Sequence, residues 1–299
     1  MTLDRPLTWR GGALYVPAPR SDPRDPAPVP AVRTDPAPPA DAVSAALALD
    51  GFARLSLDEV LAAAALQTRV DRKYLVPIPA ARQALAGLAH SHGVLSIDGR
   101  TTTGYSSVYF DSVDWGAFRA HAQGRRRRWK IRTRLYREDR LCRLELKTKQ
   151  GDTTVKQCLD LPAASHGLID EAGYDFLQAG LQAYGSTVDV ERLLPGVVIT
   201  YRRATLTDVA AGTRLTVDAD LVACLDGRAV RLRPDHVLIE TKGGAAPGAA
   251  DGALRESGVR PCSVSKYSVT LALLDPTLPG HLWRPFGRRY FAPLAAETT

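Results

Sequence analysis

The chain has 299 residues, 45% of them hydrophobic, so it is long enough to bury a sizeable core in one large domain or two modest ones. A formal net charge of +7 favours polyanionic partners, while four scattered cysteines with no Cys-x-x-Cys pair argue against a zinc site or a disulfide framework. Because no apolar stretch reaches the roughly 18 residues of a spanning helix and the N-terminus lacks a signal-peptide layout, we expect a cytoplasmic protein of undetermined oligomeric state.

The first fifty residues differ in composition from the rest of the chain. The stretch from Pro17 to Pro39 is crowded with Pro, Ala, Asp and Arg, and it shows neither helical nor strand periodicity. From Phe52 onward, Pro becomes sparse and apolar periodicity begins. We therefore expect a disordered tail over residues 1–50 and one folded domain over residues 51–299.

Three elements are predicted at the start of this domain. Ser56, with Glu59 three residues later, predicts a capping box for a helix through Leu66. Residues 67–76 and 105–111 read as strands from their β-branched and aromatic content. One parity of the first strand carries charge at Arg69, Asp71 and Lys73.

The segment 126–137 shows the clearest strand pattern in the sequence. Successive side chains of a strand face opposite sides, so residues two apart share a face. One parity is cationic and holds Arg126, Arg128, Lys130, Arg132 and Arg134. The other becomes steadily more apolar and holds Arg127, Trp129, Ile131, Thr133 and Leu135. We expect one face of this strand to be charged and the other to lie in the core.

Later segments repeat this design and bring the total to about eight antiparallel strands. Gly151 and Asp152 supply a hairpin turn between the first two of them. The predicted strands cover residues 143–149, 155–161, 197–206, 214–221 and 236–242. On each strand, alternate residues share the face that carries the charged groups. In chain order these residues are Arg143, Glu145, Lys147 and Lys149; Lys156, Cys158 and Asp160; Ile199, Tyr201 and Arg203; Arg214, Thr216, Asp218 and Asp220; and Leu238, Glu240 and Lys242. Two helices are expected at residues 165–185, for packing, and at 263–274.

A charged strand face has an ordinary explanation, because antiparallel sheets often expose one polar face to water. The predicted faces are heavily cationic, however, with few carboxylates among them. Two unit charges about 4 Å apart interact by about 4 kcal/mol at an effective dielectric near 20, so clustered cations are costly without a counter-anion. A run of phosphates would supply that anion, since Arg binds phosphate oxygens in a bidentate fork and Lys acts as a mobile point charge.

Eight sequence blocks in order carry a resemblance to a known family. They are Asp71-Arg72-Lys73-Tyr74, Tyr109-Phe110-Asp111, Lys130-Ile131-Arg132-Thr133-Arg134-Leu135-Tyr136, Leu144-Glu145-Leu146-Lys147-Thr148-Lys149, Tyr201-Arg202-Arg203, Arg214-Leu215-Thr216-Val217-Asp218, Ile239-Glu240-Thr241-Lys242 and Ser265-Lys266-Tyr267. From about Phe52 to Phe291, the chain resembles a VTC-type polyphosphate polymerase domain of the CYTH-like triphosphate tunnel metalloenzyme superfamily.

The resemblance implies an α+β fold, with an antiparallel β-barrel that forms a triphosphate tunnel and helices packed around it. It also implies ATP as phosphate donor, inorganic polyphosphate as acceptor and a divalent cation, Mn or Mg. Carried over block by block, the phosphate-binding residues would be Lys73, Arg132, Arg134, Lys147, Lys156, Tyr201, Arg203, Arg214, Ser265 and Lys266. Arg132, Arg134, Lys147 and Lys266 would be the catalytic cations. Glu240 would hold the metal, with Glu145, Asp218 or Asp220 as possible helpers.

The sequence departs from the family pattern at Ser263, where a lysine is expected, and Lys242 or Arg260 are candidates to compensate. An ion pair with an inward arginine is the competing interpretation of Glu240. For Asp218 and Asp220, balancing arginine charge is the preferred interpretation.

Other residue groups are interpreted as structural. The four arginines at 125–128 resemble a nucleic-acid patch but lead into a strand, so we expect no direct nucleic-acid binding and assign them to the mouth of the tunnel. His90, His92, His121 and His166 lack metal-ligand spacing and are assigned to the surface or to caps. Tyr74, Tyr109, Phe110 and Trp129 are assigned to packing.

Three functions follow, and polyphosphate polymerisation is favoured among them. The alternatives are a tunnel triphosphatase that hydrolyses triphosphate or nucleoside triphosphate, and a polyphosphate-binding module without catalysis. The small number of carboxylates on the predicted strands argues against hydrolysis, because hydrolytic relatives carry more acidic metal ligands. A membrane partner is left open.

Overall fold

The computed structural model describes residues 13–14, 32–33, 40–63, 70–151 and 153–294. Its α-helices are α1 (Ala40–Leu47), α2 (Leu57–Ala63), α3 (Ile78–Ala86), α4 (Gly116–Ala122), α5 (Glu171–Ala183), α6 (Ala249–Glu256), α7 (Lys266–Leu274) and α8 (Arg284–Tyr290). Its strands are β1 (Ala13–Leu14), β2 (Val32–Arg33), β3 (Ala53–Leu55), β4 (Val70–Pro77), β5 (Gly93–Leu95), β6 (Thr102–Asp111), β7 (Arg127–Tyr136), β8 (Leu141–Gln150), β9 (Thr153–Pro162), β10 (Leu194–Asp208), β11 (Thr213–Leu225), β12 (Arg228–Leu232), β13 (His236–Gly243) and β14 (Phe291–Leu294).

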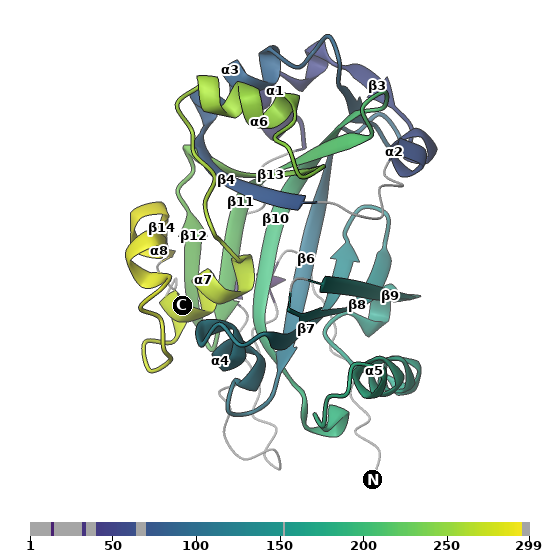
Figure 1. The fold of residues 1–299 in the computed structure, drawn as a ribbon, viewed down its shortest axis with the longest axis vertical. Helices are drawn as coiled ribbons and strands as arrows, with labels where there is room; N and C mark the ends of the chain where they lie inside the picture. The colour runs from purple at the N-terminus through teal and green to yellow at the C-terminus, as the bar shows by residue number, and fades with distance from the viewer. Residues whose placement is uncertain (1–12, 15–31, 34–39, 64–69, 152, 295–299) are drawn as a thin grey trace.

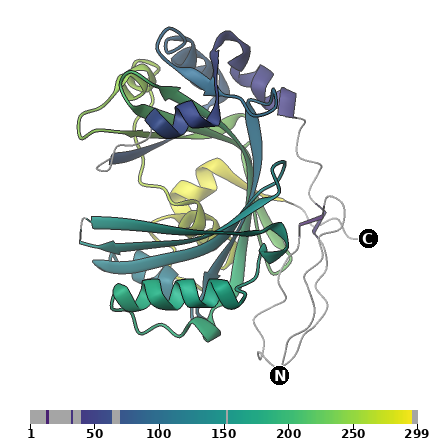
Figure 2. The same ribbon diagram turned by 90° about the vertical axis from the view of Figure 1, so that its right-hand side faces the viewer.

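Twelve of these strands form one sheet, which bends over on itself. Its main path runs β14-β12-β11-β10-β6-β7-β8-β9, while β13 joins β11 to β4 and β5 joins β10 to β3. Every pairing in the sheet is antiparallel except that of β3 with β5. The bend sets β7, β8 and β9, the β9 leaf, opposite β4, β13 and the first half of β11, the β4 leaf (Figures 1 and 2). We call the surfaces that face each other the inner face.

The expected α+β class, with an antiparallel sheet and helices packed around it, is confirmed. The expected closed barrel is not seen: within the described residues no ladder joins β9 to β4, so the sheet is open on that side. The strand number is also higher than expected. Strands β3, β5, β12 and β14 were missed because they are three to five residues long, too short for a periodic pattern.

Helices bury the sheet in three separate clusters. On the outer side of the β4 leaf, α1, α3 and α6 cover apolar residues such as Val76, Val217 and Ile239. On the outer side of the β9 leaf, α5 contributes Leu177 and Leu181 to the second cluster. A third cluster packs α4, α7 and α8 against strands at one end of the inner face. The helices therefore cover the outer sides of both leaves, and α7 covers one end of the inner face.

The alternation predicted from the sequence is confirmed in β7. Trp129 and Ile131 are buried in the second cluster, while Lys130 and Arg132 lie on the inner face. The hairpin turn is also present, since β8 and β9 pair and Gly151 has a φ of 58°. Because the side-chain period of a strand is a local property, short-range sequence was sufficient to assign these faces.

Asp220 does not share the inner face of its strand, contrary to expectation. In the β10–β11 ladder Thr200 pairs with Val222 but Arg202 pairs with Ala219, so β11 has one extra residue at this point. This β-bulge, with Asp220 at a φ of 52°, reverses the parity that follows. The carboxylate of Asp220 consequently lies 3.8 Å from Arg231 on β12.

Packing begins before the domain boundary that composition predicts at residue 51. In α1, Val43 and Leu47 are buried with Leu49 in the cluster on the outer side of the β4 leaf. Most of the expected tail, like the predicted end of the helix at Leu66, lies outside the described residues. The capping box of α2 is present: the Ser56 backbone N–H donates to the Glu59 carboxylate at 2.8 Å.

The two later helices begin further along the chain than expected. Asp170 caps α5 by accepting from Gly173 N–H, and Ser265 caps α7 by accepting from Ser268 N–H. In the part of the chain that the structure covers, no helix is both long enough and apolar enough to cross a membrane.

Candidate functional site

The inner face gathers the predicted phosphate-binding residues from seven elements. Lys73 comes from β4, Arg132 and Arg134 from β7, Lys147 from β8, Lys156 from β9, Tyr201 and Arg203 from β10, Arg214 from β11, and Ser265 and Lys266 from the start of α7. Five of the cations lie in two linked clusters, each organised by one buried carboxylate.

Glu145 on β8 organises the first cluster. Its carboxylate accepts from Arg132 Nε at 2.8 Å and lies 3.4 Å from Arg134 Nη1 and 3.1 Å from Lys156 Nζ. Burial opposes its ionisation, but Arg132, Arg134 and Lys156 hold the pKa of Glu145 well below its usual range. Arg132 also donates to the Tyr109 hydroxyl at 2.7 Å. One carboxylate thus orients three cations and leaves excess positive charge.

Asp218 on β11 organises the second cluster. Arg203 forks onto it at 2.6 and 2.8 Å, and Lys266 Nζ lies 2.5 Å from its Oδ2. Although burial raises the pKa of Asp218, Arg203 and Lys266 lower it further than burial raises it. The expectation that Asp218 balances arginine charge is thereby confirmed. Tyr105 links the clusters, because the guanidinium groups of Arg134 and Arg203 lie 5.4 and 5.2 Å from its ring centroid.

Tyr201 presents a buried hydroxyl that has no hydrogen-bond partner among the described residues. Its ring stacks on Tyr105 with centroids 5.1 Å apart, and Lys266 Nζ lies 5.0 Å from its centroid. Burial raises the pKa of Tyr201, but Arg134 and Arg203 outweigh it and lower the pKa overall. A buried hydroxyl without a partner is costly, so this group suits a ligand oxygen.

Glu240 forms an ion pair within its own strand. Its Oε1 lies 2.9 Å from Lys242 Nζ, two residues along β13 on the same face. Glu240 is therefore in an ion pair, as the competing interpretation expects, but its partner is a lysine and not the expected arginine. Lys242 also occupies the inner face, as compensation for Ser263 would require, whereas Arg260 is exposed.

A divalent cation fits this donor set in one way. No group of three or more His, Cys, Asp and Glu side chains that could hold a metal occurs among the described residues. Glu145 and Asp218 are each engaged by two or more cations, whereas Glu240 pairs with Lys242, and Asp71 lies across the ladder from that same lysine. Magnesium-type ions are commonly held by one or two carboxylates together with substrate phosphates. The residues therefore fit a metal that arrives with a phosphate ligand.

Three inner lysines form no ion pair with a carboxylate among the described residues: Lys73, Lys130 and Lys147. Burial, together with Lys147 and Lys73, lowers the pKa of Lys130 to about 7. Burial and Lys73 also lower the pKa of Lys147, against the opposing effect of Asp71. Lys73 of the β4 leaf is thus among the groups that lower the pKa of two lysines of the β9 leaf.

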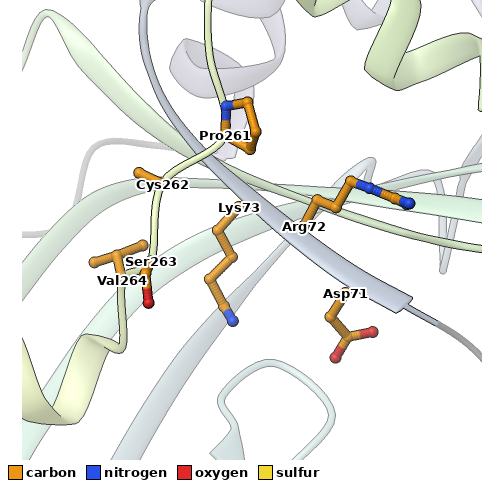
Figure 3. A pocket seen from close by; sticks show the side chains of 7 residues that line it. All are labelled: Asp71, Arg72, Lys73, Pro261, Cys262, Ser263 and Val264. Carbon is orange, nitrogen blue, oxygen red and sulfur yellow. The ribbon is translucent and has the colours of Figure 1, made fainter. Parts of the chain in front are cut away.

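A pocket of about 390 Å³ lies beside β4 (Figure 3). It is lined by Asp71, Arg72, Lys73, Pro261, Cys262, Ser263 and Val264. Figure 3 shows Asp71 and Lys73 pointing to the same side of the strand, with Arg72 directed away. Cys262 N–H donates to the Lys73 carbonyl at 2.7 Å, which holds the segment leading to α7 against the edge of β4. Ser263, where the family pattern predicts lysine, thus lies next to Lys73.

Lys130 was missed as a site residue, although its parity placed it on the cationic face. Its Nζ lies 2.9 Å from Ser265 Oγ. His121, assigned to the surface or to a cap, lies part-buried with Nδ1 2.6 Å from Ser268 Oγ. His92 is buried as well, with 3% of its surface exposed. No local sequence signal could have identified His121 or Ser268, because the contact joins residues 147 positions apart.

The remaining assignments concern arginines and aromatics. Arg127, on the outer side of β7, donates to the Tyr184 and Gly185 carbonyls and so fixes the end of α5. Tyr74, Phe110 and Trp129 are buried in apolar clusters, as expected for packing residues.

The chain was compared with family models, curated proteins and solved structures. The family model described as VTC domain matches residues 68–275. Among curated proteins, no relative matches. A solved "putative adenylate cyclase" from Bacillus halodurans is 13% identical, with a TM-score of 0.42 over 66% of this chain and 93% of that chain. A protein from Pyrococcus horikoshii is 10% identical, with a TM-score of 0.33 over 70% of this chain and 100% of that chain. A conserved hypothetical protein from Pyrococcus furiosus is 11% identical, with a TM-score of 0.28 over 63% and 87%.

Proposed function

The chain belongs to the VTC domain family, and from this premise we propose that it is a polyphosphate polymerase, which transfers the γ-phosphate of ATP onto a growing inorganic polyphosphate chain. Family membership supports a polyphosphate-related role. The particular reaction rests on the chemistry of the inner face. ATP and polyphosphate are its proposed small-molecule partners.

One observation carries the proposal: cations from both leaves face each other without enough carboxylate to neutralise them. Lys73 on β4 and Lys130 and Lys147 on the β9 leaf form no ion pair among the described residues, and burial with mutual repulsion lowers the pKa of Lys130 and Lys147. A linear polyanion lying between the leaves would relieve this repulsion. The favourable free energy of binding would come from attraction between the phosphates and these lysines, which now have mainly like charges as neighbours.

Phosphoryl transfer requires positioning and charge neutralisation more than covalent chemistry by the protein. Arg132 and Arg134, held by Glu145, are oriented for oxygens of the transferring phosphate. Lys147 and Lys266 are the proposed mobile charges from the β9 leaf and α7. Lys73, Lys156, Tyr201, Arg203, Arg214 and Ser265 are proposed to bind the rest of the chain.

A divalent cation, Mn or Mg, is proposed to accompany the phosphates. Glu240 would hold it together with phosphate oxygens, since these hard ions prefer oxygen ligands. When bound, it would neutralise charge on the phosphates. Lys242 would have to release Glu240 Oε1, so metal binding at Glu240 is expected to compete with this ion pair.

The engaged state of the carboxylates favours polymerisation over hydrolysis. Glu145 and Asp218 each contact two or more cations, so neither is free to assemble a dense acidic metal site. A triphosphatase would need such ligands to activate water. Hydrolysis, and polyphosphate binding without turnover, are the alternative functions that the experiment below distinguishes from polymerisation.

The test is purified protein with ATP and Mn, in which ADP, free phosphate and long polyphosphate are followed together. Polyphosphate with stoichiometric ADP would support the proposal. Free phosphate without chains would establish a hydrolase, and tight polyphosphate binding without turnover would establish a binding module. The matched pair is Lys266→Ala against Arg288→Ala, an exposed cation on α8. Loss of product is expected in the first variant, with normal product in the second.

A further inference from the structure

The inner face of the β9 leaf carries its charges in rows that run across three strands. Cross-strand pairing places residues of β7, β8 and β9 side by side, and successive rows on one face are two residues apart, about 6.7 Å. From the start of β7, the rows are Arg128-Lys149-Thr154, Lys130-Lys147-Lys156, Arg132-Glu145-Cys158 and Arg134-Arg143-Asp160. Cations occur in every row, whereas the carboxylates Glu145 and Asp160 occur only in the last two.

The charges at the end of β7 are neutralised within the protein. In the last row, Arg143 pairs with Asp160 at 2.5 Å, and its guanidinium lies 5.8 Å from the ring centroid of Tyr136. The turn that follows carries Glu138, which pairs with Arg202 at 2.8 Å. This end of the leaf therefore presents a phosphate chain with ion pairs and carboxylates.

The two rows at the start of β7 contain cations and no carboxylate. Arg128 lies directly opposite Lys149, and Lys130 lies directly opposite Lys147. Lys156 reaches back to Glu145 at 3.1 Å, but the other four cations form no ion pair with a carboxylate among the described residues. Like charges directly opposite each other destabilise a sheet. A solvated face would gain from mixed signs, so this arrangement indicates an anionic ligand.

Carboxylates of the β4 leaf offset this positive charge only in part. Burial lowers the pKa of Lys147, and Asp71 and Glu240 oppose this effect without cancelling it. Glu240 is itself paired with Lys242 at 2.9 Å. The excess of positive charge at the start of β7 therefore persists when the opposite leaf is included.

The cationic end of the leaf also extends past the neighbouring strand. The ladder between β6 and β7 ends at Ile131, so Arg128 lies beyond it. Figure 2 shows the adjoining ends of β8 and β9 at the free side of the leaf, away from β6 and β10. Arg128 Nη1 donates to the Arg125 carbonyl at 2.9 Å, and Arg125 and Arg126 are exposed. Positive charge thus continues from the inner face toward solvent.

We propose that Arg128 and Lys149, the exit track, bind the part of the polyphosphate chain that leaves the inner face, while the reacting end of the chain lies at Arg132 and Arg134. This inference rests on the proposed function and adds a direction to it. The row that starts at Lys130 connects the two ends. In this arrangement the chain leaves over unpaired cations and not over the ion pairs at the end of β7.

The length of the track sets which ligands reach it. Arg128 is four residues from Arg132 along β7, which corresponds to about 13 Å. A short acceptor held at Arg132 does not span this distance, whereas a long chain does. No side chain in the two cationic rows is aromatic, so the track lacks the stacking surfaces that bind single-stranded nucleic acid. An inorganic phosphate chain therefore fits it better.

The test is titration calorimetry of the full chain with long-chain polyphosphate and with tripolyphosphate, at several salt concentrations. In the double variant Arg128→Gln, Lys149→Gln, the Kd for the long chain should rise by about tenfold or more. The slope of log K against log salt should become shallower by about one for each cation lost. The Kd for tripolyphosphate should stay close to that of the parent protein. Equal weakening of both ligands, or an unchanged Kd for the long chain, would overturn the exit track.

Two further variants control for net charge and for folding. Arg288→Gln, Arg289→Gln removes the same charge from the exposed side of α8 and should leave both Kd values unchanged. An equal loss of long-chain affinity there would show that net charge governs binding, and would overturn the track. Thr154→Lys adds a cation to the Arg128 row and should tighten binding of the long chain alone, a gain that a misfolded variant cannot show.

Single-stranded oligothymidine of the same charge as the long chain tests the choice of ligand. We expect it to bind the parent protein more weakly than polyphosphate at the same salt concentration. Equal affinity for the two polyanions, with equal losses in Arg128→Gln, Lys149→Gln, would overturn the assignment of the track to polyphosphate.

The assay with ATP separates this inference from the proposed function. The double variant Arg128→Gln, Lys149→Gln should release shorter chains, because a growing chain that is held less firmly dissociates earlier. Chains of parental length would overturn the role of the track in synthesis and leave the polymerase proposal standing. No synthesis by the parent protein, with long-chain binding still dependent on Arg128 and Lys149, would overturn the polymerase proposal and leave the track as a binding site.

Discussion

At the scale of single residues, the inner face depends on carboxylates that orient cations rather than on cations alone. Glu145 contacts Arg132, Arg134 and Lys156, so the three cations share one carboxylate. Removing one cation leaves the carboxylate paired with two others, so no buried charge is stranded. Individual arginines should therefore be removable without loss of the fold.

Arg134→Ala tests this expectation. The Arg134 side chain is 9% exposed, and its guanidinium contacts Glu145 and lies over Tyr105, at the junction of the two clusters. We expect polyphosphate synthesis to fall by about 10²-fold or more, because a preorganised charge at the transferring phosphate is lost. Circular dichroism should show an intact fold. Arg127→Ala, on the opposite side of the same strand, is the control, and full activity in Arg134→Ala would remove that arginine from the site.

The pH dependence of binding is set in part by Lys130. Because burial and cationic neighbours lower its folded-state pKa to about 7, the lysine loses its charge as pH rises through that value. The charged form attracts a polyanion, so affinity for polyphosphate should decrease between pH 6 and pH 8. Titration calorimetry at constant salt concentration measures this affinity at each pH. The slope should be reduced in Lys130→Arg, and an equal slope in both proteins would show that other groups cause it.

At the scale of elements, α7 is held in place by one buried carboxylate. Asp111 at the end of β6 accepts from the Tyr267 hydroxyl at 2.5 Å and from Ala117 and Phe118 N–H of α4. The ring of Tyr267 stacks on Tyr109, with centroids 4.8 Å apart. Asp111 thus ties α4 and α7 to the sheet and fixes the helix that presents Lys266.

Tyr267→Phe removes one donor from this carboxylate while keeping the ring. We expect the free energy of unfolding to fall by about 1–3 kcal/mol, because a buried acceptor loses a partner. Urea denaturation measures it. Ring stacking should survive, so the activity lost through a displaced Lys266 should be smaller than in Lys266→Ala. A stability equal to that of the parent protein would mean that Asp111 gains nothing from this hydroxyl.

At the scale of the whole molecule, the open sheet brings two cationic leaves into opposition. The packing helices lie mainly outside the leaves and at one end, so charge repulsion between the leaves is opposed chiefly by the sheet itself. A polyanion between the leaves would replace repulsion by attraction. Ligand binding should therefore stabilise the fold as a unit.

Polyphosphate should raise the Tm of the protein. At about 100 times its Kd, a ligand adds about 2.7 kcal/mol to the free energy of unfolding, which amounts to several degrees. Differential scanning fluorimetry measures the shift, which should shrink as salt screens the charges. Sulfate at the same total charge is the control, because it cannot span both leaves. An equal shift with sulfate would indicate unspecific anion binding.

The sequence by itself determined which side chains share a face of each long strand. In β7 the alternation of Lys130 and Arg132 with Ile131 is a local property, fixed by the two-residue period of an extended chain. The ordered motifs likewise pointed to the family that matches residues 68–275. The tertiary structure alone decided what lies opposite those faces, because pairing joins residues distant in sequence. It left the sheet open, turned Asp220 outward through a bulge, and brought Lys130 to Ser265 across 135 positions.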